Sequence, residues 1–301
     1  MTKKTIFLSY LAILSVPISY GTFYSVFKIL LQDFPVFWLC WIRMFIAFIV
    51  LFPFLIFNRK IRDFSRHYIL PSFLLAFVFF IGLLAQSFSL QTISAGTAGF
   101  VTVSFVIITP FFAWLILKTI PKKSLLLSVF LVVIGYFVMF YDFSGHFFFF
   151  GIGEFLNFIG ALVIALQIVL FEKFTQKFDT MLITLAQFAW VNILMLITLL
   201  ITGEWVSLNE PSFNQWSWMI YLGIFATIIP FLAQFWGQKQ IPSVSTAIII
   251  SFEPIFAALF GVLLLQEIIS VNFYWGAMLI FIGVLSSILF NYRKPRPEII
   301  P

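Results

Sequence analysis

Residues 68–117 form a run of 50 residues without a single Asp, Glu, Lys or Arg. A helix needs about 20 apolar residues to cross the hydrocarbon core of a bilayer, so this run is too long for one crossing. The polar tetrapeptide Gln91-Thr92-Ile93-Ser94 divides it near its middle. The run therefore predicts two membrane-spanning helices joined by a short turn.

The rest of the chain repeats this pattern. Charged residues make up 9% of the 301 residues, compared with about 25% in soluble domains. Most of the surface is therefore expected to face lipid. Ten apolar segments are long enough to span a bilayer: 6–30, 34–57, 69–91, 95–117, 124–141, 151–173, 180–202, 216–238, 242–265 and 270–291. We predict an all-α membrane protein with ten transmembrane helices.

The basic residues lie on alternate connections between these segments. If the N-terminus is cytoplasmic, 15 of the 17 Lys and Arg residues fall on the cytoplasmic side, and only Lys28 and Arg43 do not. Cytoplasmic loops are enriched in Lys and Arg, and the pattern holds only for an even number of spans. We predict a multi-pass protein of the cell inner (plasma) membrane with both termini in the cytoplasm. The net charge of +6 is explained by these loops, so no nucleic-acid partner is expected.

The two halves of the chain resemble each other. Leu84-Ala85-Gln86 recurs 148 residues later as Leu232-Ala233-Gln234, and a Pro-x-Phe-Ala motif at Pro110 recurs 144 residues later at Pro254. The difference of four residues is about one helical turn, which keeps the same helix face toward the core. A repeat of five helices inserts its second copy upside down, as in many carriers with a central site between the copies. We predict two inverted five-helix repeats.

Several motifs follow the order and spacing of a known family. They are Pro35 with Arg43, Ser94-Ala95-Gly96-Thr97-Ala98-Gly99-Phe100 through Pro110, Gly153-Glu154-Phe155-Leu156, and Glu253-Pro254 with Gln266-Glu267. Over nearly its whole length the chain resembles the drug/metabolite transporter superfamily, EamA type. It departs from the pattern at Tyr20, where a tryptophan is usual, and at Lys118-Thr119-Ile120, where an acidic residue is usual. The resemblance implies ten helices, inverted repeats and secondary transport, usually export, of amino acids, nucleotide-like metabolites or drugs.

Apart from Lys28, Glu172 and Lys173 in the last turn of their segments, three ionisable residues lie within the predicted spans: Arg43, Glu154 and Glu253. A charge in hydrocarbon costs at least ~2.5–3.5 kcal/mol, so each should face a cavity or a partner. Glu253 lies near the middle of its span, and Pro254 beside it has no N–H and leaves a carbonyl one turn earlier unpaired. A carboxyl group at such a break can gain and lose a proton during a transport cycle. The alternative is a structural hydrogen bond to a neighbouring helix.

Arg43 also has two interpretations. It can hold an anionic group of a substrate at the outer end of a pocket, or it can pair with an acid and lock two helices. Glu154 enters its span from the same side as Arg43. We therefore predict a structural Arg43–Glu154 ion pair, or a contact between Arg43 and a helix end.

Uncharged polar residues complete the candidate site. Tyr20 and Tyr24 share one helix face, and Gln86 and Gln234 are related by the repeat. Interhelical hydrogen bonds, worth ~0.6 kcal/mol each in membranes, are the alternative use of such residues. The predicted substrate pathway comprises Tyr20, Tyr24, Arg43, Gln86, Gln234 and Glu253.

Other classes of function fit the sequence less well. The only histidines, His67 and His146, fall in loops on opposite sides, so no intramembrane Ser–His pair is available. A single cysteine, Cys40, excludes a cysteine metal cluster, and the chain has no phosphate-binding loop for ATP. We therefore predict no catalytic residue, metal or cofactor.

The two repeats are expected to occupy residues 1–145 and 146–301. We predict a secondary active transporter that moves a small amino-acid-like, nucleotide-like or drug-like metabolite across the inner membrane by alternating access. Export is the direction that the resemblance implies. The expected partners are a small-molecule substrate and the lipid bilayer, with the chain acting as a monomer or homodimer. The alternative is a non-transporting membrane receptor or scaffold protein.

Overall fold

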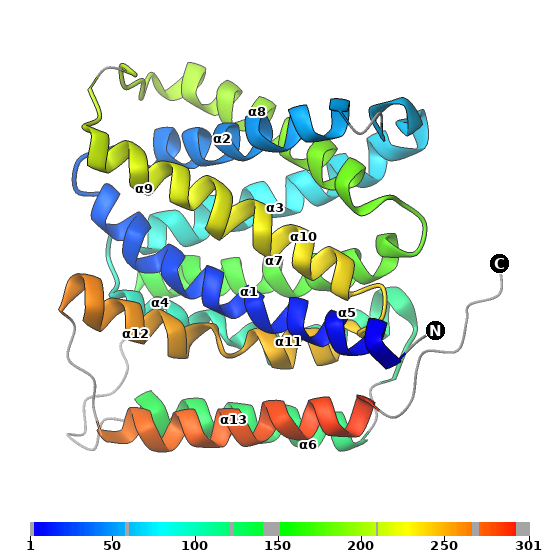
Figure 1. The fold of residues 1–301 in the computed structure, drawn as a ribbon. Coiled ribbons are helices and arrows are strands. Elements are labelled where there is room, and N and C mark those ends of the chain that lie inside the picture. The colour runs from blue at the N-terminus through cyan, green and yellow to red at the C-terminus, as the bar shows by residue number, and fades with distance from the viewer. Residues whose placement is uncertain are drawn as a thin grey trace.

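The computed structural model describes residues 3–57, 60–120, 123–140, 151–208, 210–266 and 271–292. The predicted boundary after residue 145, together with His146 and Glu267, lies outside these residues. Within them all regular structure is helical, and the fold is the predicted all-α membrane fold of ten helical spans (Figure 1). Two short 3₁₀ turns, η1 (Lys60–Asp63) and η2 (Arg66–Tyr68), join the second and third spans.

The helices of the first repeat are α1 (Lys3–Leu30), α2 (Val36–Phe57), α3 (Ile69–Ser89), α4 (Ala95–Thr102) with α5 (Ser104–Leu117), and α6 (Lys123–Phe140). Those of the second repeat are α7 (Ile152–Thr175), α8 (Thr180–Thr202), α9 (Phe213–Gly223) with η3 (Ile224–Ile228) and α10 (Ile229–Gly237), α11 (Ser243–Ile250) with α12 (Glu253–Leu265), and α13 (Val271–Tyr292). Three of the ten spans are thus interrupted.

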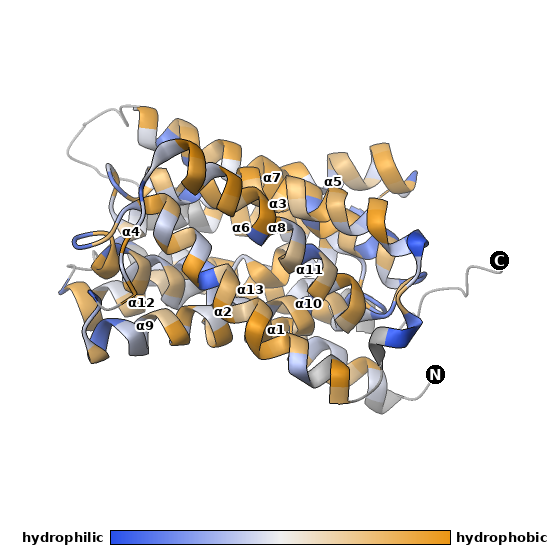
Figure 2. Cartoon of the chain, turned by 90° about the horizontal axis from the view of Figure 1, so that it is seen from above, coloured by the Kyte–Doolittle hydropathy of each residue, from blue (hydrophilic) through white to orange (hydrophobic). Residues whose placement is uncertain are grey.

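The described helices have the length and composition of membrane spans. Eight spans are long and apolar enough to cross a bilayer, and α6 and α13 carry shorter apolar stretches, Lys123–Gly135 and Tyr274–Leu289. These two helices pack along each other at one edge of the bundle (Figure 1). Figure 2 shows hydrophobic residues over the middle of the helices and hydrophilic residues gathered at the two ends. This is the distribution expected of a protein whose solvent is the bilayer.

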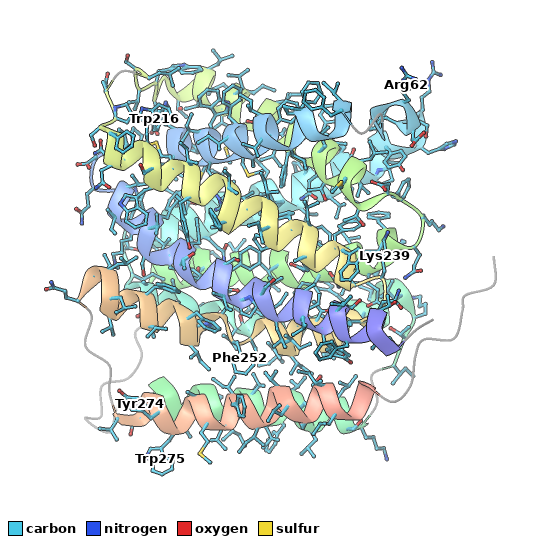
Figure 3. The ribbon with its side chains drawn as sticks, in the orientation of Figure 1. Arg62, Trp216, Lys239, Phe252, Tyr274 and Trp275 are labelled. Carbon is cyan, nitrogen blue, oxygen red and sulfur yellow. The ribbon has the colours of Figure 1, made fainter. Side chains whose placement is uncertain are left out.

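The two ends of the bundle differ in their side chains. Figure 1 shows α1 beginning and α13 ending at the same end of the bundle, as an even number of spans requires. Arg62 and Lys239 lie at this end, whereas Trp216, Tyr274 and Trp275 lie at the other (Figure 3). Aromatic side chains of this kind are typical of the membrane–water interface.

The repeat is visible in the positions of the helix ends. Ser243, the first residue of α11, lies 148 residues after Ala95, the first residue of α4, and Val271 of α13 lies 148 residues after Lys123 of α6. The two proline motifs are 144 residues apart, so they do not occupy equivalent positions when the helix starts are aligned. Equivalent helix ends are therefore related by the separation of the Leu-Ala-Gln motifs.

The repeats are interleaved rather than side by side. The first helix of the first repeat, α1, packs against α10 and α12 of the second repeat. In the same way the first helix of the second repeat, α7, packs against α3 and α5 of the first repeat. Neither half therefore buries its own apolar surface alone, and the centre of the bundle is built from both.

The fourth span of each repeat is broken at the equivalent place. In the first repeat the break is at Val103, and in the second it is at Ser251 and Phe252, with Ser251 again 148 residues after Val103. Phe252 is followed by Glu253 and Pro254 at the start of α12, where a proline is tolerated because that N–H has no intrahelical partner. Both broken spans lie next to the centre of the bundle, where backbone groups face protein and not lipid.

The eighth span is interrupted in another way. Between α9 and α10 the chain makes one π turn, η3, in which the Thr227 Oγ1 donates to the Leu222 carbonyl at 2.8 Å. A π turn widens the helix by one residue and leaves backbone carbonyls without regular partners, and it occurs often at functional sites. Pro230, the second residue of α10, has no N–H and cannot restore the missing hydrogen bond.

Candidate functional site

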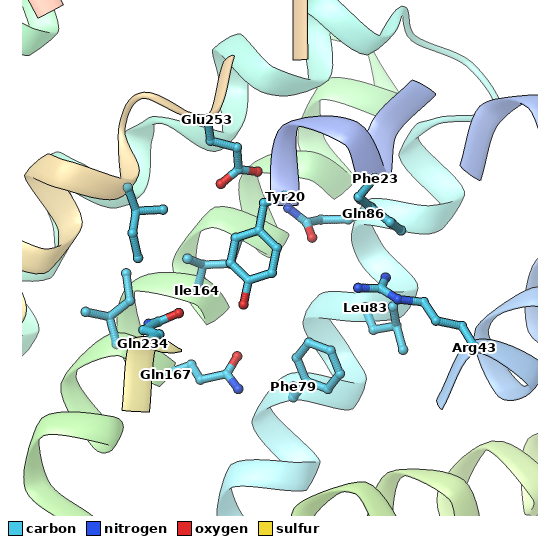
Figure 4. A pocket seen from close by; sticks show the side chains of 12 residues that line it. Tyr20, Phe23, Arg43, Phe79, Leu83, Gln86, Ile164, Gln167, Gln234 and Glu253 are labelled. Carbon is cyan, nitrogen blue, oxygen red and sulfur yellow. The ribbon is translucent and has the colours of Figure 1, made fainter. Parts of the chain in front are cut away.

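A cavity of about 60 Å³ lies between the two repeats. Its walls come from both halves of the chain: α1, α2 and α3 on one side, and α7, α10, α11 and α12 on the other. Side chains that line it are Tyr20, Phe23, Arg43, Phe79, Leu83, Gln86, Ile164, Gln167, Ile168, Gln234, Ile250 and Glu253 (Figure 4). A largely apolar wall with a few convergent polar groups is typical of small-molecule sites.

The tertiary structure brings the six predicted pathway residues together. Five of them line the cavity, namely Tyr20, Arg43, Gln86, Gln234 and Glu253. The sixth, Tyr24, is fully buried one helical turn after Tyr20 and contacts Glu253. Residues separated by up to 233 positions in the chain therefore meet at one place.

Glu253 is 4% exposed and begins α12 directly after the helix break. Its Oε1 accepts a hydrogen bond from the Tyr24 hydroxyl at 2.6 Å. The Gln86 Nε2 in turn donates to the Tyr24 oxygen at 3.5 Å. The carboxyl group is thus connected, through one phenol, to the repeat-related glutamine of α3. Such a chain of hydrogen bonds can pass a change in protonation on to the cavity wall.

The two repeat-related glutamines have different partners. Gln86 reaches Tyr24, whereas the Gln234 Nε2 donates to the Gln238 Oε1 at 3.3 Å. Gln238 then donates to the Ile168 carbonyl of α7 at 2.8 Å. The two amides occupy equivalent places in the repeat but stabilise different parts of the cavity wall.

A second polar cluster lies behind Tyr24. Asn157 of α7 is fully buried and donates to the Ala98 carbonyl at 2.6 Å and to the Thr102 Oγ1 at 2.9 Å. Its Oδ1 accepts from the Ser89 hydroxyl at 3.2 Å. This single amide joins α3, α4 and α7. Sequence reasoning did not select it, and its only signal was a polar residue among apolar ones.

Arg43 is 4% exposed and solvated by neutral groups. Its Nε donates to the Thr227 Oγ1 at 2.6 Å and its Nη2 to the Ala226 carbonyl at 2.7 Å, both in the π turn. The guanidinium carbon lies 4.3 Å from the centroid of the Phe23 ring, a cation–π distance. The irregular backbone of η3 therefore offers the acceptors that a regular helix would keep for itself.

The predicted Arg43–Glu154 ion pair requires a correction. The Glu154 Oε2 accepts from the backbone N–H of Gly151 at 3.0 Å, and so caps the start of its own helix. Glu154 lies two residues beyond the start of α7, whereas Arg43 lies seven residues beyond the start of α2, so Arg43 is about 7.5 Å further along its helix. The two side chains therefore lie at different distances along their helices, and each makes its hydrogen bonds with other groups.

Two further polar residues of α7 were not among the predicted pathway residues. Gln167 lines the cavity, is 7% exposed, and its Nε2 has no hydrogen-bond partner. A buried donor without a partner costs about 1–3 kcal/mol. Glu172 is buried near the end of α7, and its Oε2 accepts from the backbone N–H of Ser243, the first residue of α11. Its place at the end of a predicted span had hidden its burial.

The described residues hold no group of three or more His, Cys, Asp and Glu side chains that could bind a metal ion. The polar groups of the cavity are instead amides, one phenol, one guanidinium and one carboxyl group. These groups are suited to reversible hydrogen bonds and ion pairs with a polar solute.

The fold and this central site define a helical membrane transporter built from two inverted repeats. A model of the EamA-like transporter family matches residues 7–141 and 151–289, and the chain belongs to this family. The protein is therefore a transporter and not an enzyme.

Relatives of similar length support this assignment. The chain is 28% identical over 270 residues to an "uncharacterized transporter" of Archaeoglobus fulgidus, covering 90% of this chain and 82% of the relative. It is 24% identical over 295 residues to the "uncharacterized transporter YoaV" of Bacillus subtilis, covering 94% and 98%. A crystal structure with 15% sequence identity matches 97% of this chain and 99% of its own, with a TM-score of 0.74, which shows the same fold.

Proposed function

We propose that the protein is a secondary active transporter that carries a small metabolite across the cell inner (plasma) membrane by alternating access, in the direction of export. The cavity between the repeats supports this most directly. It is lined by repeat-related glutamines, Gln86 and Gln234, and lies beside the break at Glu253. A central site between inverted repeats, next to discontinuous helices, is the arrangement that alternating access uses.

The packing of α1 offers a route for this alternation. Its middle packs against α12, where Gly21 lies against the backbone of Ala257, and its first half packs against α10, where Ile13 lies against Gly237. The inverted repeat supplies related contacts between α7 and the helices α3 and α5. Loosening one set while the other stays packed would open the cavity to one side at a time.

Proton coupling through Glu253 is the second part of the proposal. The carboxyl group faces the cavity and holds the Tyr24 hydroxyl. Protonation would remove its charge and weaken this hydrogen bond, which gives the cavity two distinct states. The alternative is that the carboxyl group is a structural link between α1 and α12.

Reconstitution into liposomes tests the proposal. Labelled amino acids, nucleotides and drug-like compounds are supplied with and without a pH gradient, and uptake and counterflow are measured. We expect flux of at least one class of solute that responds to the gradient, with the response lost in Glu253→Gln. Glu154→Gln is the matched control, because Glu154 caps its own helix outside the cavity. Absence of flux and counterflow for every class would favour the receptor or scaffold alternative.

Topology is tested separately. Both termini are proposed to be cytoplasmic, with repeats at residues 1–145 and 146–301 and a monomer or homodimer as the functional form. Compartment-specific reporters fused to the two ends should both report the cytoplasm. A periplasmic signal from one end would require an odd number of spans and would contradict the inverted repeat.

A further inference from the structure

The Tyr24 hydroxyl lies between the two broken fourth spans. Its oxygen is 2.6 Å from Oε1 of Glu253, the first residue of α12, and 3.2 Å from Oγ1 of Thr102, the last residue of α4. Each of these residues adjoins the break in its span. The two helices also lie close together, since a Cβ on Gly99 of α4 would be 3.1 Å from the Cβ of Pro254. One phenol of α1 therefore contacts both interruptions.

The number of protons on these groups limits which hydrogen bonds form at one time. A tyrosine hydroxyl carries one proton, so Tyr24 donates to Glu253 or to Thr102. The Thr102 hydroxyl donates its own proton to the Ala98 carbonyl at 2.8 Å and accepts from the Asn157 amide at 2.9 Å. Toward Tyr24 it is therefore an acceptor. A glutamate side chain only accepts while it is ionised, and it gains a donor when it is protonated.

These groups can be satisfied in two ways. With Glu253 ionised, Tyr24 donates to the carboxylate, because a charge-assisted hydrogen bond is about twice as strong as a neutral one. With Glu253 protonated, the carboxylic acid donates to the Tyr24 oxygen, and the Tyr24 hydroxyl turns to Thr102. Neither arrangement leaves the buried Tyr24 donor without an acceptor. The one proton gained is the proton on Glu253, which arrives through the cavity that Glu253 lines.

We propose that Tyr24 is a two-position hydrogen-bond switch that reads the charge of Glu253. The hydroxyl fastens α1 to α12 while Glu253 is ionised, and to α4 once Glu253 is protonated. Proton binding in one repeat thereby changes the attachment of the broken helix in the other. This inference rests on the proton coupling in the proposed function, and it identifies Tyr24 and Thr102 as the positioning residues through which that coupling acts.

Few other groups around Glu253 can change their charge. Among the described residues, α12 packs chiefly against α1 and α4. The titratable side chains that face Glu253 from α1 are Tyr20 and Tyr24, and α4 carries none. Arg43 of α2 lines the same cavity on the other side of Tyr20 (Figure 4). Phenols in water ionise at about pH 10 and guanidinium groups at higher pH, so below that pH the charge changes at Glu253.

Unfolding of the full-length protein by SDS tests the switch without a solute. The equilibrium constant of unfolding is measured over the pH range in which the wild type stays folded, together with the factor by which Thr102→Val raises it. At high pH this factor contains only the bonds of Thr102 to Ala98 and Asn157. At low pH we expect it to be about threefold larger, which corresponds to one more interhelical hydrogen bond in a membrane. In a Glu253→Gln background, where residue 253 is neutral, the larger factor is expected at every pH.

Three variants separate the switch from a structural role of the hydroxyl. Thr102→Ser keeps the hydroxyl and should restore the wild-type pH profile. Thr109→Val is the matched control, because Thr109 is also fully buried and its hydroxyl donates within its own helix, to the Phe105 carbonyl at 2.6 Å. Its factor should not vary with pH. Tyr24→Phe removes the switch, so in this background Thr102→Val should have the same factor at every pH.

The outcomes distinguish the switch from the proposed function. A factor for Thr102→Val that is equal at every pH, or equal with and without Glu253→Gln, would overturn the switch. Flux driven by a pH gradient in liposomes would still support the transporter. A pH-dependent factor that disappears in Tyr24→Phe, together with no flux of any solute, would uphold the switch and overturn the transport proposal.

Discussion

Replacing Asn157 by Leu should destabilise the fold while leaving the volume of the side chain almost unchanged. The Asn157 amide makes three hydrogen bonds, to Ala98, Thr102 and Ser89, and none of its atoms is exposed. At ~0.6 kcal/mol for an average interhelical hydrogen bond in a membrane, three such bonds amount to about 2 kcal/mol. Thr102 and Ser89 keep other acceptors, the Ala98 and Gln86 carbonyls. The expected loss is therefore the bonds alone.

The free energy of unfolding can be measured by titrating SDS into micelles that contain the folded protein. Asn157→Leu should lower it by about 2 kcal/mol, whereas Thr202→Val, which removes an exposed hydroxyl bonded to Thr198, should change it by less than about 0.5 kcal/mol. A value for Asn157→Leu within that same margin would refute the argument that this amide fastens α7 to α3 and α4.

Three further predictions concern single side chains. Gly21→Val should lower the free energy of unfolding by about 1–3 kcal/mol, because a Cβ would lie 2.8 Å from the Ala257 nitrogen of α12; unchanged stability would mean that α1 and α12 are not in close contact. Glu172→Gln should cost about 0.3–2 kcal/mol in the same titration, because the carboxylate faces the N-terminus of α11, and an unchanged midpoint would contradict this helix-capping role. Lys28→Met should speed hydrogen exchange in the α3–α4 connection, because the Lys28 Nζ donates to the Ile93 carbonyl at 2.9 Å; equal exchange rates in both proteins would contradict the role of that contact.

The number and limits of the spans could be predicted from the sequence because they depend on local composition. A segment without charges cannot stay in water, and its length compared with the bilayer decides how often it crosses. The ten predicted segments agree with the ten helical spans of the described residues to within a few residues at most ends. The resemblance to the EamA type also rested on short motifs within single segments. The match to the family model confirms this resemblance.

The helix interruptions were only partly predictable. Pro254 marks the break before α12, but the equivalent break at Val103 has no proline beside it. The proline at Pro110 lies inside α5, where the helix continues. The π turn before Pro230 could not be predicted from the local sequence either. Its Ala226 carbonyl accepts a hydrogen bond from Arg43, which lies 183 positions earlier in the chain. Interruptions of this kind depend on partners from other helices.

The candidate site shows the same division. Polar residues within the spans identified Tyr20, Tyr24, Arg43, Gln86, Gln234 and Glu253 as a group, because a polar side chain in hydrocarbon must face a partner or a cavity. Composition could not indicate which hydrogen-bond partner each of these residues has. The predicted pairing of Arg43 with Glu154 rested on the position of each residue in its span alone. Once the starts of α2 and α7 are known, the two residues differ by about 7.5 Å in distance from the start of their helices.

The sequence by itself determined that the chain crosses a membrane ten times, that its halves are inverted copies, and that a small set of polar residues lies between them. These properties follow from hydrophobicity, loop charge and repetition, which are read along one dimension. Only the tertiary structure decided that Arg43 holds the π turn, that Glu154 and Glu172 cap helices, and that Gln167 lines the cavity with its Nε2 buried and unpaired. Those contacts depend on the rotation and depth of each helix, which are set by the packing of all ten spans together.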